Sequence, residues 1–375
     1  MTIPEITTQI NAKARQLGFD GIGFAAAFPP TRANQFRQWL TEGKAGTMTY
    51  LNRTAEKRTH PELVLPGVRT VITVTQSYFT GWLSPEVRNY PARGLIAAYA
   101  WGQDYHDIIL PRLEELADYL KTIAPGTETR CFTDSGPVLE REFGERAGLG
   151  FIGKNTMLIH PRRGSSFFLG EIFTTLELPP SPLPVLPGCG SCTRCLQACP
   201  THALPAPYIL DSNLCISYLT IEYKGVIPRP LRSKLGNHIF GCDDCQDCCP
   251  WNERFSAPTT EPAYASILDR QAPLLAELAA LSESDFRNKF AKSPVLRPKY
   301  EGFLRNVAIA LGNWNDEAAL DSLELLLSHE SALVRLHAAW AVGQIKTPRA
   351  SALLSRRQTI ETDENVLSEI RESIP

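Results

Sequence analysis

Nine of the ten cysteines lie between residues 188 and 251, in a pattern that is typical of iron–sulfur ligands. The first run is Cys189-Gly-Ser-Cys192-Thr-Arg-Cys195-Leu-Gln-Ala-Cys199-Pro200. The second is Cys242-Asp-Asp-Cys245-Gln-Asp-Cys248-Cys249-Pro250, and Cys215 stands alone between them. The first run has the ferredoxin spacing, in which three thiolates bind one 4Fe-4S cluster and the fourth binds another. The spacing therefore predicts two 4Fe-4S clusters.

The spacing leaves the full ligand sets partly open. The fourth ligand of the first cluster must come from elsewhere, and Cys249, also followed by proline, is the pseudo-symmetric candidate. The second cluster is left with Cys199, Cys242 and Cys245, completed by Cys215 or Cys248. Side chains of adjacent residues diverge in extended or turning backbone. We therefore expect Cys249 rather than Cys248 to bind iron, and Cys215 to complete the second cluster.

Zinc and disulfide bonds are the alternative uses of these cysteines. Zinc sites use C-x2-C pairs rather than three cysteines at this spacing followed by x3-C-P. Disulfide bonds need an oxidising compartment, and the start Met1-Thr-Ile-Pro-Glu-Ile has neither the basic nor the apolar region of a secretory signal. No apolar run reaches the length of a membrane span. We expect reduced cysteines and a cytoplasmic protein.

Strand and helix patterns alternate before the cysteines, which predicts an α/β sheet domain over roughly residues 1–180. Predicted strands cover residues 21–27, 69–75, 95–100 and 129–132. Predicted helices cover residues 6–17, 105–123 and 137–147. Neither a dinucleotide-binding nor a nucleoside-triphosphate motif is present in the sequence.

Polar groups that could do chemistry follow these strands, where open α/β sheets place their sites. Asp134 follows the strand at 129–132, and Asp104-Tyr105-His106 follows the strand at 95–100. Asp134 could equally be the N-cap of the next helix, and a lone histidine is more often structural. Lys154-Asn155-Thr156 comes after a glycine-rich stretch, which favours either close approach of backbone to a ligand or tight turns.

Composition changes on both sides of the cysteines. Just before them, five prolines between Leu178 and Gly188 predict a stiff domain boundary. The last hundred residues are rich in Ala and Leu, and Arg305-Asn-Val-Ala-Ile-Ala-Leu-Gly312 is similar to Arg335-Leu-His-Ala-Ala-Trp-Ala-Val-Gly343, which predicts HEAT-like helical repeats. The basic residues just before and within the first repeat are Arg287, Lys289, Lys292, Arg297, Lys299 and Arg305. This stretch could be a solvated face or could bind phosphates.

The chain as a whole resembles the cobalamin-dependent epoxyqueuosine reductases, relatives of the corrinoid reductive dehalogenases. The resemblance spans essentially the whole sequence. Besides the cysteine runs, it is carried by Arg58-Thr-His-Pro-Glu-Leu-Val-Leu-Pro-Gly67, Tyr99-Ala-Trp-Gly-Gln-Asp-Tyr-His106, Asp134-Ser-Gly-Pro-Val-Leu-Glu-Arg141, Gly150-Phe-Ile-Gly-Lys-Asn155, Ser217-Tyr-Leu-Thr-Ile-Glu-Tyr-Lys-Gly225 and Cys249-Pro-Trp-Asn252. Trp101 and Cys248 depart from the family pattern.

The resemblance implies three domains: an α/β cobalamin-binding catalytic domain over 1–180, a ferredoxin-like two-cluster domain over 181–260, and tRNA-facing HEAT-like repeats over 261–375. It implies cobalamin and two 4Fe-4S clusters as cofactors. The implied ligand sets are Cys189, Cys192, Cys195 and Cys249 for one cluster, and Cys199, Cys215, Cys242 and Cys245 for the other. The predicted catalytic residues are Asp134, Tyr105 and His106. The predicted cofactor contacts are Arg58, Asp134, Lys154, Asn155 and Ser217.

The implied reaction removes the epoxide oxygen of epoxyqueuosine in the tRNA anticodon loop. Two electrons enter the substrate, and since no side chain supplies electrons at such a potential, a cofactor must do so. Asp134 is then the expected proton donor, with its pKa raised by burial. We expect a tRNA substrate, an unidentified reductant protein, no membrane contact and a monomer. The alternatives are a reductive dehalogenase-like enzyme and a two-cluster electron-transfer protein with an interaction module.

Overall fold

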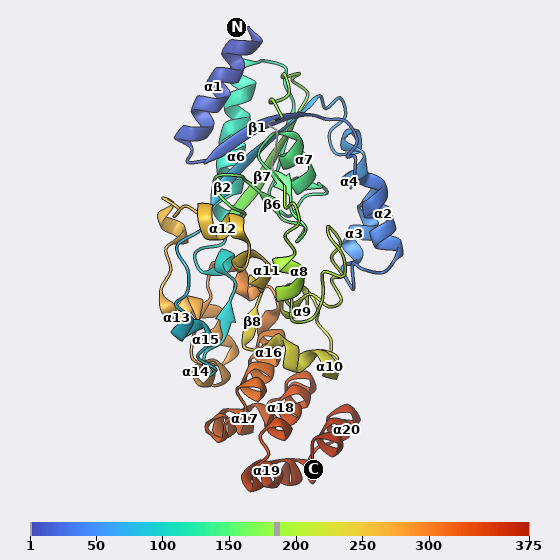
Figure 1. Cartoon of the computed structure of the whole chain (residues 1–375), viewed down its shortest axis with the longest axis vertical. Helices are drawn as coiled ribbons and strands as arrows, with labels where there is room; N and C mark the ends of the chain where they lie inside the picture. Colours follow the sequence, from blue (N-terminus) through green and yellow to red (C-terminus); the bar gives the residue numbers. More distant parts are fainter. Residues whose placement is uncertain (1, 184–187, 375) are drawn as a thin grey trace.

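The computed structural model describes residues 2–183 and 188–374. The molecule is elongated, and the N-terminal sheet and the C-terminal helices lie at opposite ends of it (Figure 1). The cysteine segment lies between them, around the short helices α8, α11 and α12. Part of the proline-rich connector, residues 184–187, lies outside the described residues.

The N-terminal sheet has four strands in the order β1-β2-β7-β4, and all neighbours are antiparallel. Its strands are β1 (Gly21–Ala26), β2 (Thr70–Ser77), β4 (Thr129–Phe132) and β7 (Phe167–Thr174). Three of them were predicted, and β7, which pairs with both β2 and β4, was missed. The predicted strand at 95–100 is wrong for this sheet: β3 (Leu95–Ile96) pairs instead with β8 (His238–Phe240), and a helical turn follows.

Helices cover both faces of the sheet. On one face lie α1 (Ile3–Gln16) and α6 (His106–Ile123), and on the other lies α7 (Glu140–Arg146). Alternating side chains separate the two cores, because successive residues of a strand point to opposite faces. Ile72 and Val74 pack with α1 and α6, whereas Val71 and Phe173 pack with α7. The predicted start of α7 at Pro137 is wrong by three residues, since residues 134–138 form a turn.

Short helices surround the sheet and carry the cysteines. Beside the sheet domain these are α2 (Ala33–Thr41), α3 (Thr49–Arg53) and α4 (Ala55–Thr59). Helix α5 (Pro85–Arg88) lies against the cysteine segment, where Arg88 pairs with Asp244 and Asp247. The cysteine segment contains α8 (Arg194–Ala198), α9 (Ile216–Ile221), α10 (Arg229–Arg232), α11 (Asp244–Asp247) and α12 (Pro250–Phe255). Within the described ranges, none of the helices combines the length and the apolar character that a membrane crossing requires.

The C-terminal helices are α13 (Leu268–Gln271), α14 (Leu275–Ala279), α15 (Glu283–Lys289), α16 (Lys299–Trp314), α17 (Leu320–Leu327), α18 (Ala332–Gln344), α19 (Pro348–Gln358) and α20 (Glu364–Ser373). The two similar sequence stretches lie in α16 and α18. The glycine of each stretch allows close contact between two helices. A Cβ on Gly312 would lie 2.7 Å from the Cα of Ala341 in α18. A Cβ on Gly343 would lie 2.6 Å from the Cβ of Ser373 in α20. The repeat thus allows each of these helices to pack closely against the next one.

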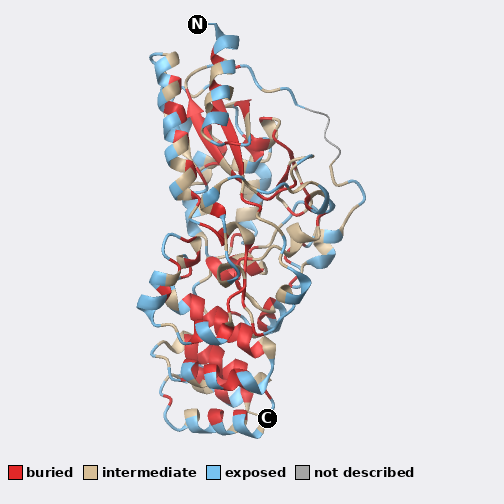
Figure 2. Cartoon of the chain, turned by 90° about the vertical axis from the view of Figure 1, so that its left-hand side faces the viewer, coloured by how far each residue is buried: buried red, intermediate tan, exposed pale blue. Residues whose placement is uncertain are grey.

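The cysteine segment and the C-terminal helices share one hydrophobic core, which contains Leu219 and Ile239 together with Phe303 and Val307. Figure 2 shows this buried core as the dense red region among the C-terminal helices. Arg305 is fully buried in it and donates hydrogen bonds to the carbonyl oxygens of Leu219, Tyr223 and Gly225 at 2.7–2.9 Å. This burial corrects the inclusion of Arg305 among the phosphate-binding residues, because its guanidinium does not reach the surface.

The repeat module also contains a buried ion pair that gives its stability a pH dependence. The carboxylate of Glu361 accepts hydrogen bonds from Nε and Nη2 of Arg335, both at 2.8 Å, and also from Arg357. Burial by itself raises the pKa of Glu361, but the bonds from Arg335, from the Asp363 backbone N–H and from Arg357 lower it to about 2. Since the unfolded value is about 4.3, this stabilisation is present above that pH and is lost as the pH falls through about 2.

We predict that Glu361→Gln reduces stability at pH 7 by roughly 1.5–3 kcal/mol, the range for hydrogen bonds to a charged group. The deficit should shrink as the pH is lowered towards 3, where wild-type Glu361 begins to lose its charge. Urea denaturation followed by far-ultraviolet circular dichroism measures both effects. Glu324→Gln is the matched control, because Glu324 pairs with Arg356 on the surface, where such pairs contribute little. Equal effects of the two substitutions would contradict this account.

Candidate iron–sulfur and proton-transfer site

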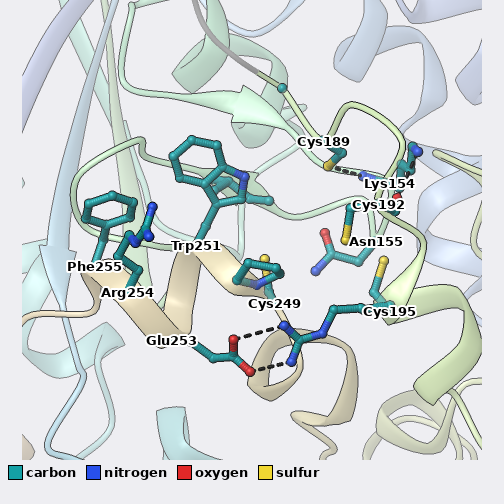
Figure 3. A pocket seen from close by; sticks show the side chains of 14 residues that line it. Lys154, Asn155, Cys189, Cys192, Cys195, Cys249, Trp251, Glu253, Arg254 and Phe255 are labelled. Atoms are coloured by element: carbon teal, nitrogen blue, oxygen red, sulfur yellow. Dashed lines mark hydrogen bonds and ion pairs between the residues drawn. The ribbon is translucent and has the colours of Figure 1, made fainter.

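Four cysteines line a single cavity of about 580 Å³: Cys189, Cys192, Cys195 and Cys249. Figure 3 shows their sulfurs pointing towards the same space, three from the loop around α8 and one from the start of α12. These four are the residues predicted as one ligand set. Four thiol sulfurs around one cavity fit a 4Fe-4S cluster, which is bound by four cysteine thiolates.

Lys154 and Asn155, predicted as cofactor contacts, lie in the wall of this cavity. The backbone N–H of Lys154 donates to Sγ of Cys189 at 3.4 Å, and its Nζ donates to the carbonyl oxygens of Gly190 and Cys192 at 2.7 and 2.8 Å. Nδ2 of Asn155 donates to the carbonyl oxygen of Cys245 at 3.1 Å. These two side chains therefore fix the cysteine loops and connect them to the sheet domain.

Within the other predicted ligand set, Cys199, Cys215, Cys242 and Cys245, neighbouring thiols act on one another electrostatically. Burial raises the pKa of Cys215, and the nearby Cys199 thiol adds to this effect. Burial and the charge of Cys215 likewise raise the pKa of Cys245, while burial, Asp244 and Cys245 raise that of Cys242. Buried, crowded thiolates of this kind need a compensating positive charge, which metal ions supply.

Backbone donors and a histidine surround this second set. The N–H groups of Ser217 and Tyr218 donate to the Cys215 sulfur, which is where the predicted contact Ser217 lies. His238, Cys242 and Asp244 offer ligand atoms within 4.8 Å of one another. Because Cys242 belongs to the predicted cluster set, this trio is part of the same site rather than a separate metal site.

Cys248 is placed differently from Cys249. Cys249 is buried and lines the cavity, whereas Cys248 is absent from the lining of that cavity. The Cys248 thiol is turned towards the carbonyl oxygen of Cys245, at 3.7 Å. The geometry therefore favours Cys249 as the ligand of the pair.

Asp134, Tyr105 and His106 meet at the end of β4. The Tyr105 hydroxyl donates to Oδ2 of Asp134 at 2.8 Å, and Nε2 of His106 lies 3.9 Å from the same oxygen. Burial and the charge of Asp134 raise the pKa of Tyr105 far above its ordinary value, so this hydroxyl stays protonated. The Tyr105 ring stacks on the His106 and Phe168 rings at centroid distances of 4.1 and 4.2 Å, which fixes its orientation.

His106 has its own carboxylate partner. Its Nδ1 lies 2.7 Å from Oδ1 of Asp104. Burial alone lowers the pKa of His106, but the hydrogen bond to Asp104 and the charges of Asp104 and Asp134 outweigh it, so the pKa is raised. His106 can therefore carry a positive charge beside the Asp134 carboxylate.

Asp134 departs from expectation in one respect: its side chain is 68% exposed. The prediction that the protein itself buries this group is wrong for the free chain. Asp134 is also not a helix N-cap, because α7 is capped at Leu139. Its backbone is left-handed, with φ of 56°, a conformation uncommon for residues other than glycine. A strained, exposed acid flanked by two donors is typical of a functional position.

Two glutamates that were not predicted lie behind this loop. Oε1 of Glu140 accepts a hydrogen bond from the Asp134 backbone N–H at 2.5 Å, and Glu171 of β7 is fully buried nearby. An acidic residue within the apolar stretch Phe-Phe-Leu-Gly-Glu-Ile-Phe was the sequence signal for Glu171. The predicted contact Arg58 lies on the same side, where its Nη1 donates to the carbonyl oxygen of Val138 at 2.8 Å.

Basic residues of the 287–305 stretch border the catalytic group. The backbone N–H of Asp104 donates to the carbonyl oxygen of Lys292 at 2.7 Å, and the charge of Arg297 acts on His106. Lys292, Arg297 and Lys299 are exposed. Three residues of the stretch have acidic partners: Arg287 pairs with Glu283 at 2.5 Å, Arg297 pairs with Glu222 at 3.1 Å, and Lys289 pairs with Asp269.

Comparison with known families agrees with this arrangement. Residues 188–252 match the family described as a 4Fe-4S double cluster binding domain, and residues 299–374 match HEAT repeats. The chain thus combines a sheet domain, a domain of the 4Fe-4S cluster-binding kind and a helical-repeat tail. Residues 58–135 match the family described as epoxyqueuosine reductase QueG, DUF1730.

Curated relatives extend this match over most of the chain. The epoxyqueuosine reductase of Pseudomonas aeruginosa is 41% identical over 88% of this chain and 91% of its own. The enzyme of Xanthomonas campestris is 40% identical over 91% and 96%, and that of Escherichia coli is 38% identical over 92% and 90%. The chain belongs to the epoxyqueuosine reductase family and is an oxidoreductase.

Solved structures give the same result. An epoxyqueuosine reductase bound to an epoxyqueuosine-modified tRNA stem loop has a TM-score of 0.90 at 32% identity, over 100% of this chain and 99% of that chain. A Bacillus subtilis epoxyqueuosine reductase, in which an aspartate-bearing catalytic loop is swung out of the active site, has a TM-score of 0.89 at 31% identity over the same shares. A catabolic reductive dehalogenase, at a TM-score of 0.39, is too remote to support an argument.

We predict that Cys249→Ser removes about half of the bound iron and that Cys248→Ser removes none. Of these two residues, only Cys249 lines the cavity that Cys189, Cys192 and Cys195 also line. Iron and sulfide content, together with electron paramagnetic resonance of the reduced protein, measure the loss. Equal iron content in the two variants would contradict this assignment of ligands.

Proposed function

We propose that this chain reduces epoxyqueuosine to queuosine in the anticodon loop of tRNA. In the proposal, cobalamin receives electrons through two 4Fe-4S clusters, and Asp134 donates a proton. The family and its iron–sulfur domain support the reaction class, and the tRNA stem loop bound to a structural relative supports the substrate. The three-part division at residues 1–180, 181–260 and 261–375 belongs to the same proposal.

The observation that carries the proposal is a series of contacts between Asp134 and the second cysteine set. Tyr105 donates to Asp134 at 2.8 Å, and the Tyr105 ring centroid lies 6.3 Å from that of Tyr99. The backbone N–H of Ala98, the residue before Tyr99, donates to Oδ2 of Asp243 at 2.6 Å, and Asp243 directly follows Cys242. The proposed acid and the proposed electron store therefore lie on the same side of the molecule.

Reduction of an epoxide requires both electrons and protons. Converting an epoxide to an alkene breaks two C–O bonds, consumes two electrons and two protons, and releases the oxygen as water. Cysteine-bound clusters accept one electron at a time from a low-potential donor. Bound cobalamin would supply the strongly reducing cobalt centre that this conversion needs. The aspartate-bearing catalytic loop of the Bacillus subtilis relative supports a catalytic aspartate.

The residues of the chain then have definite tasks. Tyr105 orients the Asp134 carboxyl through its hydroxyl, and Asp134 donates the proton to the oxygen that leaves the carbon. Its exposed carboxyl faces open space, so the bound cofactor and base, rather than the protein, would exclude water from it. Arg58 and Ser217 offer hydrogen-bond donors to the cobalamin, while Lys154 and Asn155 fix the cysteine loops. This division fits the donor chemistry of the residues present.

The basic segment next to the catalytic group is the proposed tRNA contact. Lys292, Arg297 and Lys299 are exposed and adjoin Asp104 through the Lys292 carbonyl. A base inside an RNA helix cannot reach a side chain at the end of β4, whereas a base in a single-stranded loop can be turned out. Cations beside the site would then bind the phosphates that flank the extruded base.

The proposal predicts that anaerobic turnover of epoxyqueuosine-containing tRNA removes one oxygen atom only when cobalamin is present. Asp134→Asn should lower the rate by roughly 10²–10⁴-fold, the contribution of a well-placed general acid, while iron and cobalamin binding are retained. Nucleoside mass spectrometry after digestion measures the product. Asp107→Asn is the control, because Asp107 is exposed on the first turn of α6. Turnover without cobalamin, or an active Asp134→Asn enzyme, would contradict the respective assignment.

For the tRNA interface, we predict that reversing the charges of Lys292, Arg297 and Lys299 to glutamate weakens binding. The slope of log affinity against log salt concentration should fall by roughly 0.7–0.9 for each phosphate that the variant no longer neutralises. Fluorescence anisotropy with an anticodon stem loop, at several salt concentrations, gives the slope. Arg287→Glu should leave the slope unchanged, because Arg287 pairs with Glu283 within α15, whereas Lys292 and Arg297 adjoin Asp104 and His106. An unchanged slope in the triple variant would exclude this segment from the interface.

A further inference from the structure

Two carboxyl groups lie against each other on the α7 face of the sheet. Glu171 is in the middle of β7, opposite Thr73 of β2 and Phe132 of β4, and its side chain is completely buried. Glu140 is the first residue of α7, which packs on this face of β7, and its charge acts on Glu171. Neither oxygen of Glu171 has a hydrogen-bond partner of another kind among the described residues.

A hydrogen bond between two carboxyl groups requires that one of them carry a proton, because a carboxylate can only accept. Burial raises the pKa of Glu171 well above its ordinary value, and the charge of Glu140 raises it further. Burial and the charge of Asp134 raise the pKa of Glu140 to about 7. At neutral pH the pair therefore keeps at least one proton. Glu171 is its holder, because Glu140 already accepts the Asp134 N–H whereas neither oxygen of Glu171 has a donor among the described residues.

The pair is connected to Asp134 through the backbone. Oε1 of Glu140 accepts a hydrogen bond from the Asp134 backbone N–H at 2.5 Å. Asp134 is the one residue of the 132–140 segment whose φ is positive. On the other side of the loop, the Thr133 hydroxyl donates to the carbonyl oxygen of Leu169 in β7 at 2.8 Å. The left-handed turn that exposes the Asp134 side chain is thus fastened to β7 and to Glu140.

We propose that Glu140 and Glu171 form a buried acid–carboxylate pair that positions the Asp134 loop, with Glu171 keeping the shared proton and Glu140 binding the Asp134 N–H. Glu140 is then a positioning residue, and Glu171 keeps it in place. The inference rests on the proposed role of Asp134 as proton donor. It goes further in explaining how a catalytic acid on an exposed turn keeps its orientation.

Stability alone does not account for the pair. Replacing a buried ionisable group by a well-packed apolar one is often neutral or stabilising, and Glu171 lies on the same face of β7 as Phe173 of the apolar core beneath α7. Glu140 touches the catalytic loop through the backbone N–H of Asp134. These positions connect the two glutamates to the loop that carries Asp134.

The test uses the full-length, cofactor-loaded enzyme and two substitutions. Glu140→Gln removes the charge that binds the Asp134 N–H and should lower kcat by roughly 10-fold or more, the value of a hydrogen bond to a charged group. KM for tRNA and the iron content should not change, since Glu140 is not proposed to contact either. Glu171→Gln preserves a neutral donor of the same shape and should retain most of the activity, whereas Glu171→Leu should reproduce the defect of Glu140→Gln.

Infrared spectroscopy gives a readout that is independent of activity. The apoprotein should show the C=O stretch of a buried protonated carboxyl, which Glu171→Gln removes and Asp134→Asn retains. Glu142→Gln is the matched control on the same helix: Glu142 is also buried, but it accepts hydrogen bonds from Thr31 and Arg32, so kcat should not change. A normal kcat in Glu140→Gln, or an unchanged band in Glu171→Gln, would overturn the inference. An active Asp134→Asn enzyme would instead overturn the proton-donor role on which it rests.

Discussion

The backbone carbonyl groups of the cysteine loops must find hydrogen-bond donors, and the rest of the structure depends on how they do so. Helices α8, α9 and α11 have only five, six and four residues, so regular secondary structure satisfies few of these groups. Buried polar groups without partners are costly. Lys154 and Asn155 donate from the sheet side, and Arg305 and Asn306 donate from the helical side. Iron binding thus relies on both neighbouring domains.

This dependence explains why the three parts occur in one chain. Arg305 and Asn306 lie in the first long repeat helix and bind carbonyl oxygens at the end of α9 and in β8. The same helix begins a few residues after Lys292, whose carbonyl binds the backbone of Asp104. Movement of the repeats would therefore disturb both the cysteine loops and the catalytic group. The proposed binding of tRNA by the basic segment next to these helices would therefore hold the substrate in register with the Asp134 group.

Sequence patterns predicted the parts of the molecule whose chemistry is local. The spacing of the cysteines indicated two sets of cluster ligands, because ligands that are close in sequence lie on the same loop. The resemblance supplied Tyr105 and His106 beside Asp134. Strand β7 was missed although it is central: it is covered by helices on both faces, so it lacks the alternation of a half-exposed strand. Its absence from the prediction also concealed Glu171, whose partner is thirty-one residues away in sequence.

The exposure of Asp134 follows from what the site must admit. The proposed role of Asp134 as proton donor to a bulky substrate requires that the front of its carboxyl remain open, as it is in the structure. The orientation of Asp134 must then come from its other contacts. Tyr105 donates to Oδ2 of Asp134, and Glu140 accepts the backbone N–H of Asp134. Neither contact blocks the remaining carboxyl oxygen. An acid fixed in this way is oriented before substrate arrives, and it loses less conformational freedom when the substrate closes over it.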